Sequence, residues 1–282
     1  MMSDVLDRFA ATTQTIREPE QLRTYECDGL TGHRVVPALV AMPGSVEEVQ
    51  AVVRVCNEER IPFVARGAGT GLSGGALPVA EGIVISLARL TRILEIDVER
   101  GYVVVEPGVA NLDVTRAVED AGFYYAPDPS SQQVCTIGGN VAENSGGAHC
   151  LKYGFTVNHV LAAEIVLPDG ELVELSVWDE GPDLLGAFVG SEGTLGIATK
   201  LTLRILRAPE AVRTLLAGFA HTDEAGAAVS GVIAAGIVPA AIEMMDALTM
   251  QAAEAAVGAN YPDGCGAALI VEIGRASCRE RV

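Results

Sequence analysis

Residues 66–75 read Arg66-Gly67-Ala68-Gly69-Thr70-Gly71-Leu72-Ser73-Gly74-Gly75, with five glycines in ten positions. The apolar run 61–65 just before them predicts a buried strand. Glycine lets a bulky group approach the backbone without a Cβ in the way, and successive backbone N–H groups can form a concave anion site. We therefore expect this loop to hold a diphosphate; the alternative interpretation is a flexible surface turn.

The sequence after the loop separates it from two common nucleotide motifs. Residues 82–87 read Gly-Ile-Val-Ile-Ser-Leu, which predicts a second strand instead of a helix. A Rossmann fingerprint needs a strand, a glycine loop and a helix in that order, and a P-loop ends in Gly-Lys followed by Ser or Thr. The loop fits neither motif, so a different cofactor-binding fold is expected.

Two further glycine clusters follow downstream. One is Thr136-Ile137-Gly138-Gly139-Asn140-Val141-Ala142-Glu143-Asn144-Ser145-Gly146-Gly147, and the other is Gly190-Ser191-Glu192-Gly193-Thr194-Leu195-Gly196-Ile197. Three glycine loops between strands suggest one large cofactor held by backbone at several points. The asparagines could instead satisfy loop backbone groups, but their place between two Gly-Gly pairs favours cofactor contact.

Composition limits the classes of function. The chain has 282 residues, 49% of them hydrophobic, and a formal net charge of −18. Phosphate backbones would be repelled, so nucleic acid is not an expected partner. No apolar run approaches the ~20 residues of a membrane span, and the N-terminus lacks a signal-peptide pattern, so a cytoplasmic protein with no transmembrane segment is expected. The six cysteines include no Cys-x-x-Cys pair, which indicates free thiols and no metal site.

Hydrophobic patterning predicts alternating strands and helices. Ser45 with Glu48 three residues later forms a capping-box signature at the start of a helix. Asn111 is expected to cap a second helix that ends before Gly122. Strands are expected at 36–43, 93–97, 102–106, 161–167, 171–175 and 197–206. Beyond 209 the pattern predicts strand 214–219, helix 223–235, strand 240–244, helix 247–257 and strand 267–273.

These elements predict four segments. Residues 1–34 form a helical lead-in, 35–209 a cofactor-binding domain and 210–274 part of a second domain. Residues 275–282 contain three of the chain's arginines in an otherwise acidic protein and follow an apolar strand directly. We interpret them as a non-native tail, which would leave the second domain truncated.

The clusters, in this order and spacing, resemble the FAD-binding domain of the vanillyl-alcohol oxidase/p-cresol methylhydroxylase (PCMH-type) superfamily. The similarity covers residues 20–274 and is greatest to the branch of FAD-linked 2-hydroxyacid dehydrogenases that includes the FAD-linked subunit of glycolate oxidase. Residues 144–154 and 190–197 carry it, and 239–246 look like the entry to the cap domain. The resemblance implies an α+β fold: a PCMH-type FAD-binding domain of two α/β subdomains, then the start of a ferredoxin-like α/β cap domain.

The resemblance also implies which residues bind the cofactor. The first loop would surround the FAD diphosphate, 127–131 and 136–144 would line the flavin and ribityl-diphosphate, and the third cluster would close over the other side. The implied cofactor-binding residues are Arg66, Gly67, Ala68, Gly69, Thr70, Gly71, Gly74, Gly75, Pro127, Asp128, Ser130, Thr136, Gly138, Gly139, Asn140, Ala142, Asn144, Gly147, Glu192, Gly193 and Ile197.

Some superfamily members attach FAD through a histidine in the first loop. Residues 66–70 contain none, so non-covalent FAD is expected. His149 and His159 are interpreted as ordinary surface or strand-end histidines. The family's histidine-rich metal and substrate motif is not found, so the catalytic base and any metal ligands are expected beyond the end of this chain. Glu243 is the single carboxylate considered near the substrate, and a structural role for it is preferred.

The activity implied by the resemblance is oxidation of a small 2-hydroxy acid, glycolate or D-lactate, to the 2-oxo acid. The C2 hydride would pass to flavin N5 while a base takes the hydroxyl proton. A D-2-hydroxyglutarate-type dehydrogenase and a non-catalytic FAD-binding electron-relay subunit remain alternatives. An iron–sulfur partner subunit is implied, and through such subunits the protein could lie peripherally on the inner face of a membrane. A scaffold binding a bare nucleotide is disfavoured, because one anion nest would suffice for it.

Overall fold

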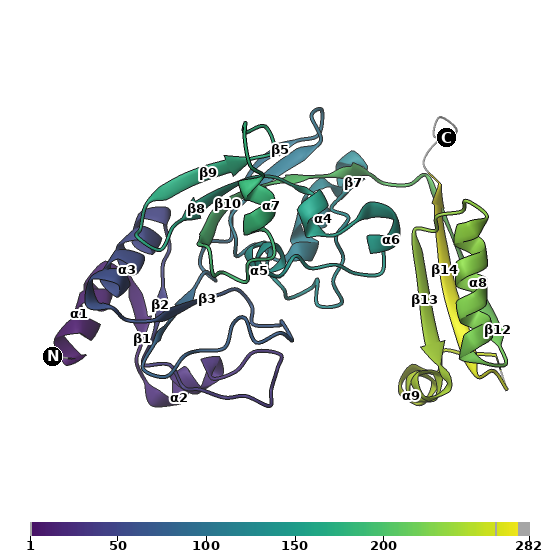
Figure 1. Cartoon of the computed structure of the whole chain (residues 1–282), viewed down its shortest axis with the longest axis horizontal. Coiled ribbons are helices and arrows are strands. Elements are labelled where there is room, and N and C mark those ends of the chain that lie inside the picture. The colour runs from purple at the N-terminus through teal and green to yellow at the C-terminus, as the bar shows by residue number, and fades with distance from the viewer. Residues whose placement is uncertain (1, 263, 276–282) are drawn as a thin grey trace. The chain divides into compact units, whose positions relative to one another are not determined.

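The computed structural model describes residues 2–262 and 264–275 (Figure 1). The described chain divides into two compact units, one made of residues 2–145 and 155–206, the other of 146–154, 207–262 and 264–275. Most of the expected non-native tail, residues 276–282, lies outside the described residues. In the described part of the chain, no helix is both long and apolar enough to cross a bilayer.

The first unit begins with a four-stranded sheet in the order β1–β2–β4–β3. Its strands are β1 (Gln14–Ile16), β2 (Leu39–Met42), β4 (Ile83–Ser86) and β3 (Phe63–Arg66). Both β2 and β3 run parallel to β4, whereas β1 pairs with β2 in the antiparallel sense. Helices α1 (Met2–Thr12) and α3 (Val46–Glu59) contribute Phe9, Val49 and Val52 to the core of this sheet. The expected strand–helix–strand start is therefore confirmed.

The glycine loop is the connection between β3 and β4. Neighbouring parallel strands need a crossover of a dozen or more residues, which is usually a helix. Here residues 67–82 make that crossover without a helix or strand. The connection leaves the carboxyl end of β3, the edge at which α/β sheets commonly bind ligands.

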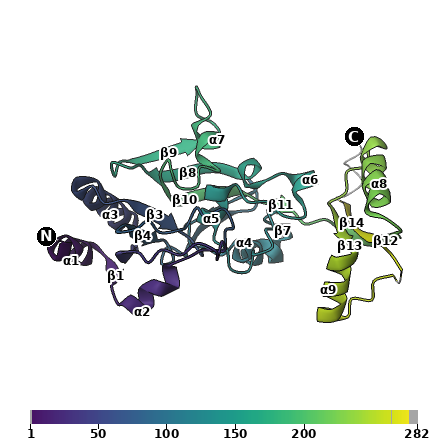
Figure 2. The ribbon, with the colours of Figure 1, turned by 60° about the horizontal axis from the view of Figure 1, so that its bottom comes forward.

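The first unit also contains a five-stranded antiparallel sheet in the order β5–β6–β10–β8–β9. Figure 2 shows three of its strands, β10, β8 and β9, in this order. Its strands are β5 (Ile93–Asp97), β6 (Tyr102–Val105), β10 (Ile197–Arg204), β8 (Val160–Val166) and β9 (Leu172–Ser176). Leu201 and Leu203 of the central strand β10 are fully buried, and α4 (Asn111–Val118), α5 (Ile137–Glu143) and α7 (Leu184–Phe188) contribute to the same core. The predicted β5–β6 hairpin is confirmed.

The start of α4 differs from the expectation. Ala110, and not Asn111, occupies the N-cap position. The first amides of the helix donate instead to backbone carbonyls, Asn111 N to Cys135 O and Leu112 N to Gln132 O. A side-chain cap is not needed, because those carbonyls already satisfy the donors. The Asn111 side chain is buried and donates to Pro127 O at 3.0 Å.

The second unit contains a three-stranded sheet in the order β12–β14–β13. Its elements follow the predicted alternation: β12 (Ala211–Phe219), α8 (Thr222–Ala234), β13 (Ala241–Asp246), α9 (Ala247–Val257) and β14 (Ala267–Arg275). Ala225 of α8 packs against Leu269 and Val271 of β14. Strand β14 extends to Arg275, the first residue assigned to the expected tail.

Short elements complete the fold. They are α2 (Pro19–Leu22), η1 (Arg23–Tyr25), η2 (Glu119–Ala121), β7 (Phe123–Tyr124), α6 (Cys150–Tyr153), η3 (Thr156–Asn158) and β11 (Leu206–Arg207).

The start of α3 is stabilised by its cap and by one carboxylate. Ser45 Oγ accepts the Glu48 backbone N–H at 3.3 Å, as the capping signature predicts. The Glu48 carboxylate accepts from Thr13 Oγ1 at 2.6 Å and from Gly44 N at 2.8 Å. The hydrogen bond from Thr13 is the main reason that the pKa of Glu48 lies below its usual value, and the bond from Gly44 adds to the effect.

We predict that Glu48→Gln destabilises the first unit by about 1 kcal/mol at pH 7, because the charged acceptor for Thr13 and Gly44 is lost. A carboxylate whose pKa is lower in the folded state stabilises above its unfolded pKa, and this contribution disappears as the pH falls through the folded pKa. The stability difference between wild type and variant should therefore be present down to about pH 4.3, the usual pKa of a glutamate, and should shrink as the pH falls below it. Urea unfolding of wild type and variant at pH 7 and pH 3.5 measures this stability difference.

Glu99→Gln is the control, because Glu99 is an exposed carboxylate in the β5–β6 turn. It should change stability little at either pH. A Glu48→Gln difference that is equally large at both pH values would contradict the assignment.

Candidate functional site

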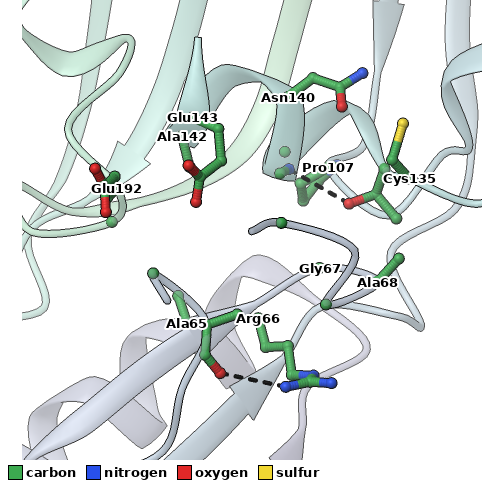
Figure 3. A pocket seen from close by; sticks show the side chains of 18 of the residues that line it. Ala65, Arg66, Gly67, Ala68, Pro107, Cys135, Asn140, Ala142, Glu143 and Glu192 are labelled. Atoms are coloured by element: carbon green, nitrogen blue, oxygen red, sulfur yellow. Dashed lines mark hydrogen bonds between the residues drawn. The ribbon is translucent and has the colours of Figure 1, made fainter. Parts of the chain in front are cut away.

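A cavity of about 360 Å³ lies within the first unit, between the first glycine loop and α5 (Figure 3). Most of the residues predicted to bind the cofactor line this cavity. They are Arg66, Gly67, Ala68, Gly69, Thr70, Gly71, Gly75, Thr136, Gly138, Gly139, Asn140, Ala142, Glu192, Gly193 and Ile197. All three glycine clusters therefore contribute to one cavity. Its size falls in the range of small-molecule and cofactor sites.

The backbone amides of the first loop lack acceptors among the residues that the structure describes. No N–H group of residues 67–76 donates a hydrogen bond to another described residue. Eight of these ten residues are half-buried, and Leu72 and Ser73 are exposed. Buried and semi-buried backbone N–H groups are nearly always paired, so eight half-buried donors without a partner in one loop are unusual. They form a donor-rich wall, as an anion such as a diphosphate requires.

Glycine is required in this loop for steric reasons. A Cβ on Gly67 would overlap Thr136 Oγ1, and one on Gly75 would lie 2.7 Å from Glu143 Oε1. Gly69 has φ +69°, a left-handed conformation that side chains other than glycine rarely adopt. At Gly67 the loop thus packs directly against Thr136, the N-cap of α5, with no room for a side chain.

The Arg66 side chain contacts the glycine loop on the side that faces away from α5. This side chain points away from α5 in Figure 3, and Arg66 is 8% exposed. Nη1 donates to Cys27 O at 2.8 Å and to Ala76 O at 3.2 Å, and the guanidinium lies 5.5 Å from the centre of the Tyr25 ring. Burial lowers the pKa of Arg66, which nevertheless remains a strong base.

The second glycine cluster was expected to be a loop, and this expectation was wrong. Residues Ile137–Glu143 form helix α5, with Thr136 as the N-cap accepting from Gly139 N. Gly138 N donates to Pro107 O at 2.8 Å, and a Cβ at Gly138 would lie 2.6 Å from the Pro107 Cβ. The glycines here allow close helix packing, which outweighs their poor helix propensity.

The third cluster completes the C-terminal end of α5. Gly190 N donates to Val141 O and Glu192 N to Ala142 O, both at 2.8 Å. These bonds satisfy carbonyls that a helix end leaves without partners. Gly190, Glu192 and Gly193 all have positive φ, which allows the chain to turn tightly under the helix.

Two carboxylates face the cavity from opposite segments. Glu143 of α5 accepts from Ser73 Oγ at 2.6 Å, and Glu192 lies close to it in Figure 3. Both would repel a phosphate placed beside them, yet both are suited to accept hydrogen bonds from sugar hydroxyls. The cavity thus offers two environments, one rich in N–H donors and one rich in carboxylate acceptors.

Asn140 and Cys135 lie at the buried end of the cavity. Asn140 is 2% exposed, and its Nδ2 has no hydrogen-bond partner of ordinary geometry among the described residues. Its neighbour is the Cys135 thiol, a weak acceptor. Burial raises the pKa of Cys135, so this group is a neutral thiol near pH 7. An amide donor without a hydrogen-bond partner among the described residues favours the binding of a polar ligand at this place.

Six of the predicted residues do not line the cavity. Gly74 lies in the first loop with φ +86°, and the carbonyl of Pro127 is used by Asn111. Asn144 ends α5, and its Oδ1 accepts from Val157 N at 2.9 Å, so it satisfies backbone as the structural interpretation held. The remaining residues outside the cavity lining are Asp128, Ser130 and Gly147, the last of which belongs to the second unit.

The histidines and Glu243 have structural surroundings. His159 is 2% exposed, beside Tyr125, so it ends a loop before β8 in the interior and not on the surface. His149 Nε2 lies 3.1 Å from Glu272 Oε1 within the second unit. Glu243 is exposed on β13. The described residues contain no group of three or more His, Cys, Asp or Glu placed to hold a metal ion.

Other residues line the cavity that were not named individually as cofactor-binding. They are Ala65, Leu72, Ser73, Ala76, Leu87, Pro107, Ser131, Cys135, Glu143, Ser145, Phe188, Gly196 and Ala198. Of these, Leu72, Ser73, Ser131 and Glu143 lie within the ranges expected to surround the cofactor. Pro107 and Phe188 carry no local signal, because only the tertiary fold brings them to the cavity.

Family comparisons agree with this geometry. Residues 37–176 match the family described as FAD binding domain, and residues 208–280 match the family described as FAD linked oxidases, C-terminal domain. Among solved structures, alkyldihydroxyacetonephosphate synthase superposes with a TM-score of 0.86 over 97% of this chain and 56% of that chain. At 20% sequence identity this likeness shows the fold alone.

Curated relatives are similar over most of this chain. Glycolate oxidase subunit GlcD of Escherichia coli (strain K12) is 47% identical over 263 residues, which are 92% of this chain and 53% of that protein. The Bacillus subtilis (strain 168) subunit GlcD is 41% identical, covering 88% and 54%. The D-lactate dehydrogenase of Anaerostipes hadrus is 41% identical, covering 74% and 45%.

The chain spans about half the length of the curated relatives it matches. The expected α+β FAD-binding fold is confirmed by the family matches and by the structural neighbour. This chain belongs to the PCMH-type superfamily of FAD-linked oxidases.

Proposed function

We propose that the cavity between the first glycine loop and α5 binds FAD non-covalently, and that the protein oxidises a small 2-hydroxy acid such as glycolate or D-lactate. The observation that carries the proposal is the row of free backbone amides at residues 67–76. A diphosphate needs many N–H donors, and backbone amides supply them without adding positive side chains to an acidic protein.

The remaining parts of FAD also find suitable groups. The carboxylates of Glu143 and Glu192 are suited to ribose or ribityl hydroxyls, as carboxylates are in dinucleotide sites. Leu87, Pro107 and Phe188 supply apolar surface for an aromatic ring system. The chemistry that FAD supplies is acceptance of a hydride from the substrate carbon. The chain's own residues bind and orient the cofactor and limit the entry of water.

The titratable side chains among the described cavity residues are Arg66, Cys135, Glu143 and Glu192. Arg66 points away from α5, and the raised pKa of Cys135 makes its thiol a poor proton acceptor at neutral pH. Glu143 already accepts from Ser73. We therefore assign these residues to cofactor binding and leave removal of the substrate hydroxyl proton to a group outside this cavity.

The names of two relatives bear on partner subunits, and the cavity lining bears on a second candidate function. The Escherichia coli and Bacillus subtilis relatives are named as subunits, so we infer that this protein also assembles with other subunits, an iron–sulfur protein among them. A non-catalytic electron-relay subunit is the second candidate function. It is favoured by the absence of an imidazole or amine from the described cavity lining.

The purified chain should show a flavin absorbance spectrum when supplied with FAD, and acid precipitation should leave the colour in the supernatant. Gly67→Ala should weaken FAD binding at least about tenfold, because the added methyl overlaps Thr136 Oγ1 and displaces the loop. A fluorescence-quenching titration with FAD measures the affinity.

Gly32→Ala is the matched control, because a Cβ there meets nothing within 4 Å and the φ is unstrained. It should bind FAD as wild type does. A folded wild-type chain that takes up no FAD would refute the proposed function. Equal FAD affinity of Gly67→Ala and wild type would show that the cofactor does not use this loop.

The FAD-loaded chain should be bleached at 450 nm when glycolate or D-lactate is added without oxygen. We expect the reaction to be about 10²–10⁴-fold slower than an enzyme with a positioned base, since that is the usual contribution of a general base. Its rate should rise with pH, because hydroxide then helps to remove the hydroxyl proton. Acetate, which lacks the hydroxyl group, is the control.

Stopped-flow absorbance measures fast reduction of the flavin, and absorbance scans over hours measure slow reduction. Bleaching by dithionite but by neither hydroxy acid would favour the electron-relay alternative. Rapid reduction that does not depend on pH would show that a cavity residue already acts as the base.

A further inference from the structure

Arg66 joins three segments that are distant in the sequence. Its backbone ends β3, and its carbonyl accepts from Leu87 N at 3.0 Å, directly after β4. Its side chain donates to Ala76 at the far end of the glycine loop and to Cys27 in the N-terminal lead-in. The first of these side-chain bonds closes residues 66–76 into a ring.

The guanidinium occupies the inside of this ring. The Cζ and nitrogen atoms of Arg66 fill the space that a Cβ on Gly69 would need, and the positive φ of Gly69 leaves that space open. The loop carbonyl of Ala76 accepts a hydrogen bond from the cation, while the amides of 67–76 donate to no group of the described residues. A buried cation with a planar donor fork can therefore hold the loop in one conformation.

The charge of Arg66 is positioned to act on an anion. It is a buried cation that contacts Gly69 and the Ala76 carbonyl of the loop, whose ten amides donate to no described residue, in a protein whose formal net charge is −18. Charges act more strongly in a buried, low-dielectric environment than at the surface. The opposing group is Asp28, a buried carboxylate whose Oδ1 accepts from Leu30 N and whose field partly offsets the cation.

We propose that Arg66 is the positioning residue of the diphosphate site: it closes the 66–76 ring, turns the loop amides toward the ligand and supplies the balancing buried charge. This inference rests on the proposed FAD-binding function. It assigns to Arg66 a role toward the diphosphate alone, since its side chain points away from the rest of the cavity.

The test compares two ligands that contain the diphosphate with one that lacks it. FAD and ADP contain it, and riboflavin does not. Isothermal titration of the full chain with each ligand should show that Arg66→Met lowers FAD and ADP affinity at least about tenfold, with riboflavin affinity unchanged. Arg100→Met is the control for net charge, because Arg100 lies in the exposed β5–β6 turn.

A second pair of variants covers the case in which Arg66→Met fails to fold. Gly69→Ala keeps Arg66 but forces the guanidinium out of the ring, and Gly122→Ala carries the same left-handed strain with nothing within 4 Å. Gly69→Ala should lose FAD and ADP affinity at least about tenfold while Gly122→Ala retains both.

The outcomes separate this inference from the function on which it rests. If wild type binds neither FAD nor ADP, the proposed function fails. If wild type binds both and the Arg66→Met and Gly69→Ala variants bind them equally well, only the role of Arg66 is refuted. A parallel loss of riboflavin affinity would also refute it, because general damage to the cavity would then explain the result.

Discussion

The pairing of β3 with β4 is the constraint on which this cofactor site depends. Two neighbouring parallel strands require a crossover, and residues 67–82 provide one without a helix. A helical crossover would have satisfied its own amides, whereas this one leaves ten of them free. The strand pairing thus places the loop, the glycines let it pack against α5, and Arg66 holds its two ends together.

The lining of the cavity also explains how a chain with a negative net charge can bind an anion. Side-chain cations are scarce in the cavity, where Arg66 is the single Lys or Arg among the described lining residues. Backbone dipoles therefore carry most of the expected interaction with a diphosphate. Glu143 and Glu192 occupy the same cavity and suit hydroxyl groups, so the lining is matched to a ligand that carries both phosphate and sugar. Such a division of donors and acceptors suits FAD better than a simple anion.

Much of this architecture could be predicted from sequence, because local patterns determine it. The cap at Ser45, the β5–β6 hairpin and the alternating elements after residue 209 follow from short-range signals. Helix α5 was missed because its Ile-Gly-Gly-Asn start has poor intrinsic propensity, and only the tertiary contact with Pro107 explains Gly138. The cap at Asn111 was wrongly predicted for a related reason, since its side chain binds the Pro127 carbonyl, a neighbour that the sequence does not reveal. The hydrogen bond from Val157 N to Asn144 was not foreseen either.

The most direct test of the central claim observes the loop amides themselves. Nitrogen–proton correlation spectra of the ¹⁵N-labelled chain would be recorded with and without ADP and FAD. The account predicts that the resonances of residues 67–76 show the largest shifts with either ligand, and that these amides exchange rapidly with solvent before binding. Tight FAD binding with unchanged loop amides would contradict it and would place the diphosphate elsewhere.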